Sequence, residues 1–177
     1  MCKRGSRGLT ALLVCAGLLA GCGSLSSYMP AVDPVPGTNV QQETVTRVVD
    51  GDTIVVREGT LTVRILGIDS PETRKPNTPV QCGGPESTAW AKLQLPIGSQ
   101  VALQTEAGRE DTDRYGRRLA YVKYVKDNQT LDFSVESARA GMSRNYVYDK
   151  RPVSLQSDIE AAETEARNAH RGLWNHC

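Results

Sequence analysis

The sequence predicts an α+β fold with a mostly β core, in which a small closed barrel of five strands is packed with about three helices. Five short segments are rich in β-branched residues and bounded by turn residues, as strands are. Helix-starting residues and apolar residues at helical spacing occur between and after these segments. All of them lie within about 135 residues, the size of one ordinary domain.

The expected strands share a high content of Val, Ile, Leu and Thr and cover 43–49, 53–56, 61–66, 100–104 and 118–122. Asp50 and Gly51 form a turn signal between the first two strands, and residues 57–60 turn the chain back before the third. Asp69 then opens a long polar loop that runs to about Gly83.

The first expected helix follows this loop. Gly84, Pro85 and Glu86 suit a helix start, because proline is favoured at the first helical position. Apolar residues then recur at helical spacing before a proline stops the helix, and they are Ala89, Trp90 and Leu93.

Two more helices are expected in the C-terminal third. Asp132 can cap a short helix to Ala140, with Gly141 as its stop. Ser154 can cap a final helix that ends at Gly172. Its core-facing side chains follow helical spacing and are Leu155, Ile159, Ala162, Ala166 and Ala169.

The composition excludes some classes of protein. The chain has 177 residues, 39% of them hydrophobic, and no apolar run reaches the roughly 18–20 residues of a membrane-spanning helix. We therefore do not expect an integral transporter or channel. Five cysteines without a Cys-x-x-Cys pair indicate neither a disulfide-dense small fold nor a zinc site.

The first 21 residues have the layout of an export signal. Lys3, Arg4 and Arg7 precede a short apolar stretch at 9–20. Leu-Ala-Gly before Cys22 resembles the lipobox of a bacterial lipoprotein signal peptide, which implies that Cys22 is acylated and becomes the first mature residue. An uncleaved apolar helix, or a plain signal peptide cut elsewhere, remains the alternative.

Residues 22–42 are rich in Ser, Pro and Gly without helical or strand spacing, so we expect a flexible tether before a domain at 43–177. This places the domain outside the cytoplasm, held to the membrane by a lipid anchor. Cleavage removes three of the 21 Lys and Arg and none of the 20 Asp and Glu, which leaves a formal charge of −2. A polyanionic partner would therefore need a local cluster of positive charge.

Three clusters indicate chemistry, and they are Asp-Gly-Asp-Thr at 50–53, residues 64–73, and Asp-Arg-Tyr-Gly-Arg at 113–117. The hairpin between the first two clusters can bring Asp52 and Asp69 together. Close carboxylates repel each other, and a hard divalent cation such as Ca²⁺ relieves the repulsion.

The same clusters contain a possible base and two cations. Glu72 follows closely enough to orient or deprotonate a water molecule. Arg64 and Arg117 come from different strands, and a pair of guanidiniums suits a phosphate. A metal, a carboxylate and two arginines together suit phosphodiester hydrolysis.

The motifs DGDT, R-x4-DSPE and DRYGR, in this order, resemble those of the staphylococcal-nuclease-like (thermonuclease) family over about residues 44–174. The resemblance implies a five-stranded OB-fold barrel with three helices. It also implies a Ca²⁺-dependent endonuclease that cleaves DNA and RNA and leaves 3′-phosphate and 5′-hydroxyl ends.

The resemblance also implies roles for individual residues. Asp52 and Asp69 would be side-chain metal ligands, and Ser70 would offer its backbone carbonyl. The catalytic residues would be the general base Glu72 and the phosphate-binding arginines, Arg64 and Arg117. Tyr115 would lie beside the bound nucleotide, and Tyr146 and Tyr148 resemble a tyrosine pair near the nucleotide base. We expect Tyr115 and Tyr146 to bind substrate, and plain packing is the alternative for Tyr146.

Cys82 and Cys177 are the cysteines that remain after lipidation. Outside the cytoplasm an even pair usually forms a disulfide, so we expect a bridge from the C-terminus to the loop before the first helix. Two free thiols are the alternative.

The main hypothesis is therefore a monomeric, lipid-anchored nuclease whose partners are its nucleic-acid substrates and the membrane. A non-catalytic nucleic-acid-binding barrel is a second reading, although every residue that the chemistry needs is present. A structural envelope lipoprotein that binds protein or glycan is a third.

Overall fold

The computed structural model describes residues 29–30, 37–73 and 78–177. The expected signal peptide and Cys22 lie outside the described residues, as does most of the expected tether. Within the described ranges, no helix combines the length and the apolar character needed to cross a bilayer.

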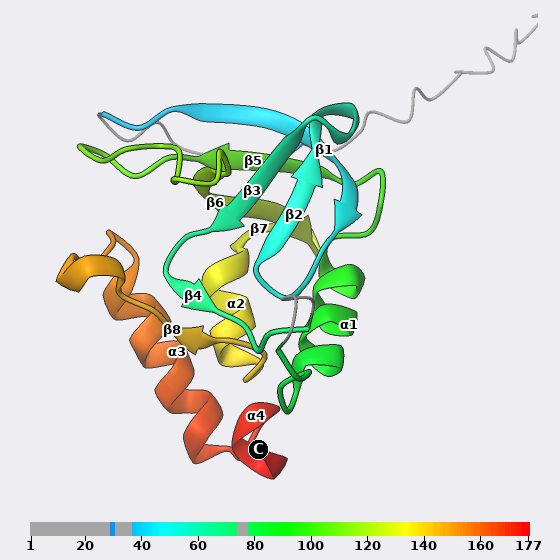
Figure 1. The fold of residues 1–177 in the computed structure, drawn as a ribbon, viewed down its shortest axis with the longest axis vertical. Coiled ribbons are helices and arrows are strands. Elements are labelled where there is room, and N and C mark those ends of the chain that lie inside the picture. The colour runs from blue at the N-terminus through cyan, green and yellow to red at the C-terminus, as the bar shows by residue number, and fades with distance from the viewer. Residues whose placement is uncertain (1–28, 31–36, 74–77) are drawn as a thin grey trace, which may run out of the picture.

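Five strands close into the expected barrel (Figure 1). They are β1 (Val40–Val48), β2 (Thr53–Val56), β3 (Leu61–Ile65), β5 (Gln100–Gln104) and β6 (Arg118–Lys126). Neighbours in the order β3-β2-β1-β5-β6 pair antiparallel, and a parallel pairing of β3 with β6 closes the barrel. The fold class is therefore the one that the sequence predicts.

Three further strands lie at the edges. The strand β7 (Gln129–Asp132) forms a hairpin with β6. The short strands β4 (Ile68–Asp69) and β8 (Arg144–Asn145) pair with each other below the barrel (Figure 1). The β4–β8 ribbon matters for function, because it holds Asp69.

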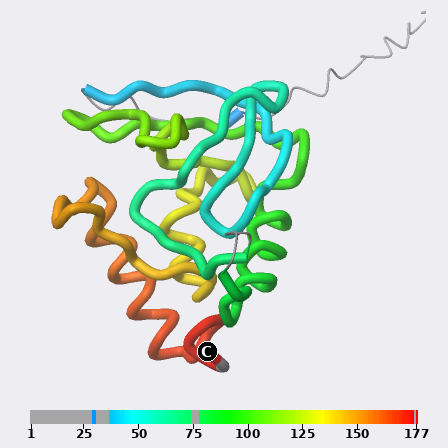
Figure 2. Tube along the Cα trace, in the orientation of Figure 1, coloured from blue at the N-terminus to red at the C-terminus, as the bar shows by residue number. Residues whose placement is uncertain are grey.

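Three helices and one terminal turn cover the lower part of the molecule (Figure 2). They are α1 (Gly84–Gln94), α2 (Phe133–Arg139), α3 (Gln156–Asn168) and α4 (Leu173–His176). Two short 3₁₀ turns, η1 (Arg57–Gly59) and η2 (Tyr148–Lys150), complete the fold.

The helices fix the turn that leads from β3 to β4. Phe133 of α2 is fully buried, and its ring lies 5.3 Å from that of Trp90. The neighbouring Ser134 hydroxyl donates to the carbonyl of Leu66 at 2.8 Å. A side chain at Gly67 would collide with Ile159 of α3, since a Cβ there would lie 2.4 Å from its Cδ1. Both helices therefore press on the segment that presents Asp69.

Some elements differ from the sequence prediction at their ends. β1 begins at Val40, so residues 40–42 of the expected tether pair with β5 instead. β6 runs four residues past 122 to a hairpin at Asp127 and Asn128, which have φ of 50° and 60°. The sequence pattern missed β7 because this polar hairpin and short strand have little apolar alternation.

The buried faces and the ends of the helices also differ in part from the sequence prediction. Leu93 of α1 is 78% exposed and Ala89 is exposed, so the expected stripe is wrong at these two positions, whereas Trp90 is half-buried and packs against the core. The side chains that α1 buries are small ones or lie at its end, and they are Ser87, Thr88, Ala91 and Leu95. Asp132 does cap α2, accepting from two backbone N–H groups. Ser154 does not cap α3, which ends before Ala169.

Candidate active site

Asp52 is buried at the start of β2, with 6% of its surface exposed. The turn before it is tight, and the Asp50 carboxylate accepts the backbone N–H of Asp52 at 3.1 Å. Gly51 has no room for a side chain, because a Cβ would lie 2.7 Å from the Cβ of Ser70. This close approach requires glycine and brings the β1–β2 turn against the segment that follows β4.

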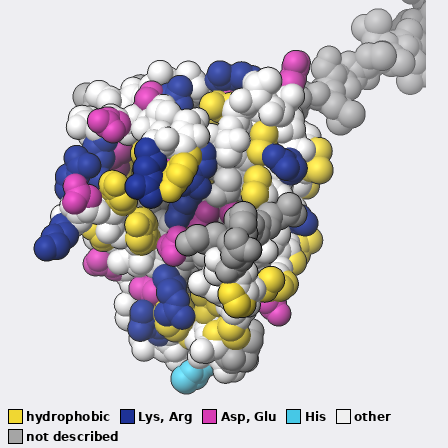
Figure 3. Space-filling model, viewed as in Figure 1, with side chains coloured by type: hydrophobic (Ala, Val, Ile, Leu, Met, Phe, Trp, Pro, Cys, Tyr) yellow, Lys and Arg dark blue, Asp and Glu magenta, His cyan; other side chains and the backbone are white. Residues whose placement is uncertain are grey.

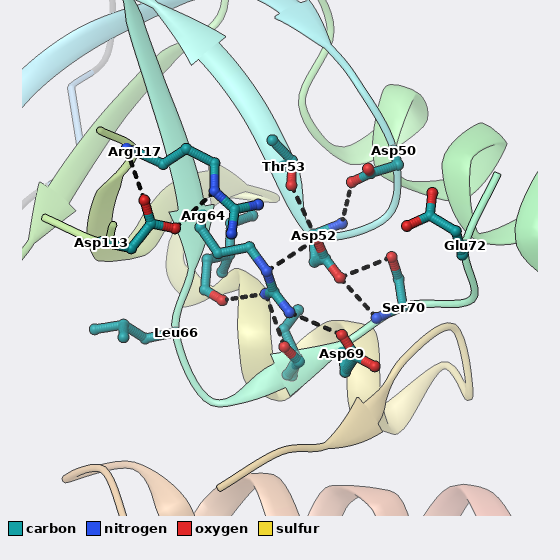
Figure 4. A network of polar contacts seen from close by, with 12 residues as sticks. Asp50, Asp52, Thr53, Arg64, Leu66, Asp69, Ser70, Glu72, Asp113 and Arg117 are labelled. Atoms are coloured by element: carbon teal, nitrogen blue, oxygen red, sulfur yellow. Dashed lines mark hydrogen bonds and ion pairs between the residues drawn. The ribbon is translucent and has the colours of Figure 1, made fainter. Parts of the chain in front are cut away.

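Hydrogen bonds hold the Asp52 carboxylate in one orientation (Figure 4). Ser70 donates to its Oδ2 through the backbone N–H at 2.7 Å and through the hydroxyl at 2.9 Å. The Thr53 hydroxyl donates to Oδ1 at 2.9 Å. The Ser70 side chain therefore matters in its own right, beside the metal contact expected of its carbonyl.

Arg64 lies between the two aspartates that the sequence places at the site. Its Nη1 donates to the carbonyl oxygens of Ile65 and Ile68, each at 2.8 Å. Its Nη2 donates to Asp69 Oδ1 at 2.9 Å, and its Nε lies 3.4 Å from Asp52 Oδ1. The structure therefore joins Asp52, Arg64 and Asp69 in one network.

Negative charge dominates this network. Burial raises the pKa of Asp69, and the charges of Asp52 and Glu72 raise it further. Arg64 opposes this rise without cancelling it. Burial and the charge of Asp52 also raise the pKa of Asp50 to about 6. Four carboxylates thus interact in this network and Arg64 pairs with two of them, an arrangement that a bound cation would relieve.

Glu72 lies on the α1 side of the network (Figure 4). Its backbone N–H donates to the side-chain oxygen of Gln81, and the Gln81 N–H donates back to the Glu72 carbonyl, both at 2.9 Å. Its carboxylate accepts the N–H of Thr73 at 2.9 Å. Gln81 therefore fixes the backbone that carries the expected base.

Arg117 is held by a carboxylate of its own. Asp113 Oδ2 accepts Arg117 Nε at 2.8 Å, and Asp113 Oδ1 accepts the backbone N–H groups of Tyr115 and Arg117. Burial opposes ionisation of Asp113, but these hydrogen bonds outweigh it and lower its pKa. The parallel pairing sets Arg64 of β3 opposite Leu119 of β6, which lies two residues after Arg117.

Tyr115 is 67% exposed and lies between two arginines. The guanidinium carbon of Arg114 is 4.8 Å from its ring centre, and that of Arg117 is 5.4 Å away. Tyr146 is 42% exposed and donates its backbone N–H to the carbonyl of Gly67, and Tyr148 is 64% exposed. The side chains of both tyrosines are therefore accessible to a ligand.

Lys and Arg side chains gather on this face of the molecule. Figure 3 shows them with hydrophobic side chains among them, both above and below the acidic side chains near its centre. A domain of modest net charge thus has the local positive clusters that a polyanion needs.

Cys82 and Cys177, 95 residues apart, form a disulfide. A Cβ at Gly83 would lie 2.1 Å from Leu173 Cδ2, so the C-terminal turn packs tightly on the residue after Cys82. The next residue, Gly84, lies against the backbone of Glu72. The C-terminus and the Glu72 loop are therefore in one packed unit.

The donors available to a metal are oxygens. Among the described residues no group of three or more His, Cys, Asp and Glu is arranged to hold a metal ion. Asp52 and Asp69 supply two carboxylates, and backbone carbonyl oxygen and water would complete a shell. Ca²⁺ accepts such oxygen-only sets of mixed charge. Burial is the main cause of the raised pKa values of Asp50 and Asp69, and neighbouring carboxylates add to it. The residues therefore fit Ca²⁺.

The sequence predicts no individual role for three residues that hold the site residues in place. They are Thr53, Gln81 and Asp113. Asp113 had a local signal, because an aspartate that begins a turn commonly accepts the N–H two residues later. Gln81 had none, since its partner lies nine residues earlier in the chain.

Comparisons with known proteins agree with this geometry. Residues 62–176 match the family model described as staphylococcal nuclease homologue. Thermonuclease from Staphylococcus hyicus is 38% identical over 140 residues, which cover 77% of this chain and 78% of that protein. Thermonuclease from Staphylococcus intermedius is 38% identical over 141 residues, which cover 77% and 79%. Endonuclease YncB from Bacillus subtilis is 34% identical over 134 residues, which cover 75% and 61%.

Proposed function

The chain belongs to the staphylococcal nuclease family, and we propose that it is a Ca²⁺-dependent nuclease that hydrolyses phosphodiester bonds of DNA and RNA. The observation that carries this proposal is the network in which Arg64 binds both Asp52 and Asp69. These residues come from three separate strand ends, and Glu72 interacts with the same charges.

The carboxylates of Asp52 and Asp69 and the backbone carbonyl of Ser70 would hold Ca²⁺. When bound, the ion supplies positive charge that polarises the phosphoryl group and stabilises the charge that grows on it. Ser70 and Thr53 keep Asp52 oriented for this role through their hydrogen bonds.

Arg64 serves as the phosphate clamp. Its Nη1 group is fixed by two backbone carbonyls, which anchors the guanidinium, while its Nε and Nη2 edge faces the two aspartates. With a cation on the two aspartates, that edge would be free to bind phosphoryl oxygens through two parallel hydrogen bonds. Arg117, held by Asp113, contributes the second guanidinium.

Glu72 orients a water molecule and accepts its proton as the oxygen attacks phosphorus. The bond to the 5′-oxygen breaks, and that oxygen takes a proton from solvent water to become a 5′-hydroxyl, so the phosphate stays on the 3′ side. None of these steps uses a 2′-hydroxyl, which is why both DNA and RNA would be substrates. Tyr115 offers its exposed ring to the nucleotide.

The activity would be exported. Residues 1–21 would be removed and Cys22 acylated, which would anchor the domain outside the cytoplasm. The disulfide between Cys82 and Cys177 supports this location, because such bonds persist in oxidising compartments. Replacing Cys22 by Ser should move the protein from the membrane fraction to the soluble one and abolish labelling by radioactive palmitate. Unchanged labelling would contradict the anchor.

Two substitutions test the enzymatic proposal. Arg64→Ala and Glu72→Ala should each lower kcat on plasmid DNA by about two orders of magnitude or more, since each removes transition-state stabilisation. Arg57→Ala is the control, because Arg57 is an exposed arginine paired with Glu43. Near-normal rates in either site variant would contradict the proposal, and binding without cleavage by the unaltered chain would favour a non-catalytic barrel.

A further inference from the structure

A small cavity adjoins the candidate active site. Its volume is about 240 Å³, and it lies between the β4–β8 ribbon and the C-terminus. Its lining includes four polar or charged residues, Asp69, Ser70, Gln81 and Arg144, together with the Cys82–Cys177 disulfide. The cavity therefore shares Asp69 and Ser70 with the site already described.

Arg144 faces this cavity from β8. The antiparallel register sets Arg144 directly opposite Asp69, so the two side chains lie on the same face of the ribbon. Asp69 nevertheless forms its ion pair with Arg64 and not with Arg144. In the part of the chain that the structure describes, no ion pair includes Arg144. Its charge is therefore not cancelled by a neighbouring carboxylate.

The Arg144 guanidinium is nevertheless held in place. Its central carbon lies 4.5 Å from the ring centre of Trp174, and the guanidinium of Arg167 lies 4.0 Å from the same ring. Stacking on an indole orients a guanidinium without using its N–H donors, which stay available to a ligand. Arg167 differs because it also pairs with Glu163 in α3.

We propose that Arg144 and this cavity bind a further phosphate of the substrate strand, next to the phosphate that is cut. The proposal rests on the proposed function, because it extends the same site. Tyr115, Arg114 and Arg117 come from the segment just before β6, and Arg144 comes from β8. Figure 3 shows positive side chains on both sides of the acidic groups. A nucleic-acid strand that crosses the acidic groups would thus meet positive charge on both sides of them.

The test compares the full-length chain with Arg144→Ala, Arg144→Lys and Arg167→Ala, using single-stranded DNA of two lengths. Arg144→Ala should raise KM for a ten-nucleotide strand about 3–10-fold, and should leave KM for a dinucleotide unchanged because that substrate has no further phosphate. The slope of log KM against log salt should fall by about 0.7, the value for one phosphate contact on a single strand. Arg144→Lys keeps the positive charge, so its slope of log KM against log salt should equal that of the unaltered chain.

Arg167→Ala is the matched control, because it removes the other guanidinium from Trp174 without touching the cavity. Equal effects of Arg144→Ala and Arg167→Ala would assign Arg144 to packing and overturn the proposal. So would an Arg144→Ala variant that matches the unaltered chain at both lengths.

Binding gives an independent readout. Fluorescence anisotropy with the same ten-nucleotide strand, in chelator and at low salt, should show weaker binding by Arg144→Ala than by Arg167→Ala. If the unaltered chain cuts neither substrate, the proposed nuclease function fails, while this binding comparison still decides the role of Arg144. Equal binding by the two variants would reject it.

Discussion

Removal of the Cys82–Cys177 disulfide should destabilise the domain substantially. The bond closes a loop across 95 residues, and chain-entropy arithmetic for a loop of that length gives about 4.7 kcal/mol. Measured losses for native disulfides are commonly about 2–5 kcal/mol, so we expect a fall in this range for the double variant Cys82→Ser, Cys177→Ser. The same change loosens the C-terminal turn from Gly83, so kcat should fall as well, because Gln81 and Glu72 lie in the adjoining loop.

Urea denaturation followed by circular dichroism measures this loss. The unaltered chain under reducing conditions is the matched sample, and it should agree with the double variant to within about 1 kcal/mol. The oxidised chain treated with reductant and then reoxidised is the control for reversibility. A loss below about 1 kcal/mol in both samples would refute the reasoning that this bond limits the freedom of the unfolded chain.

Three further substitutions test individual contacts of the site and of the fold. Asp113→Ala should lower kcat roughly 10–100-fold, because Arg117 loses its carboxylate partner, and steady-state kinetics on one DNA substrate measures this. Gly51→Ala should destabilise the fold by about 1–3 kcal/mol in urea denaturation, because the new methyl group meets Ser70. Glu106 has a lowered pKa, since hydrogen bonds to its carboxylate outweigh the opposing effect of burial. The ionised Glu106 therefore stabilises the fold fully at pH values above its pKa in the unfolded chain, and this stabilisation is lost as the pH falls through its pKa in the folded protein. Glu106→Gln should therefore make the free energy of unfolding fall less steeply between about pH 5 and pH 3. A kcat within twofold of normal would contradict the prediction for Asp113→Ala, and an unchanged unfolding midpoint would contradict that for Gly51→Ala. An unchanged dependence of stability on pH would contradict that for Glu106→Gln.

The barrel and its sites were predictable where local sequence patterns determine them. β-branched runs bounded by turn residues locate the barrel strands, and the hairpin that follows from them brings Asp52 and Asp69 together. Asp132 signals the start of α2 because its capping bonds are local. The chemistry of carboxylates and guanidiniums at these positions then indicates a phosphate site.

Contacts made through tertiary packing were not predictable in the same way. The face that α1 buries depends on what lies beneath it, so Leu93 is exposed although it is apolar. Arg144 gains its position from a two-residue ribbon, which is too short for any periodic pattern to reveal.

Cleavage of a labelled single-stranded DNA by the full-length protein, with Ca²⁺ and then with chelator, tests the central claim most directly. The account predicts cutting in Ca²⁺, loss of cutting in chelator and recovery when Ca²⁺ is restored, with 3′-phosphate ends on the products. Undiminished cutting in chelator would contradict the roles given to Asp52 and Asp69.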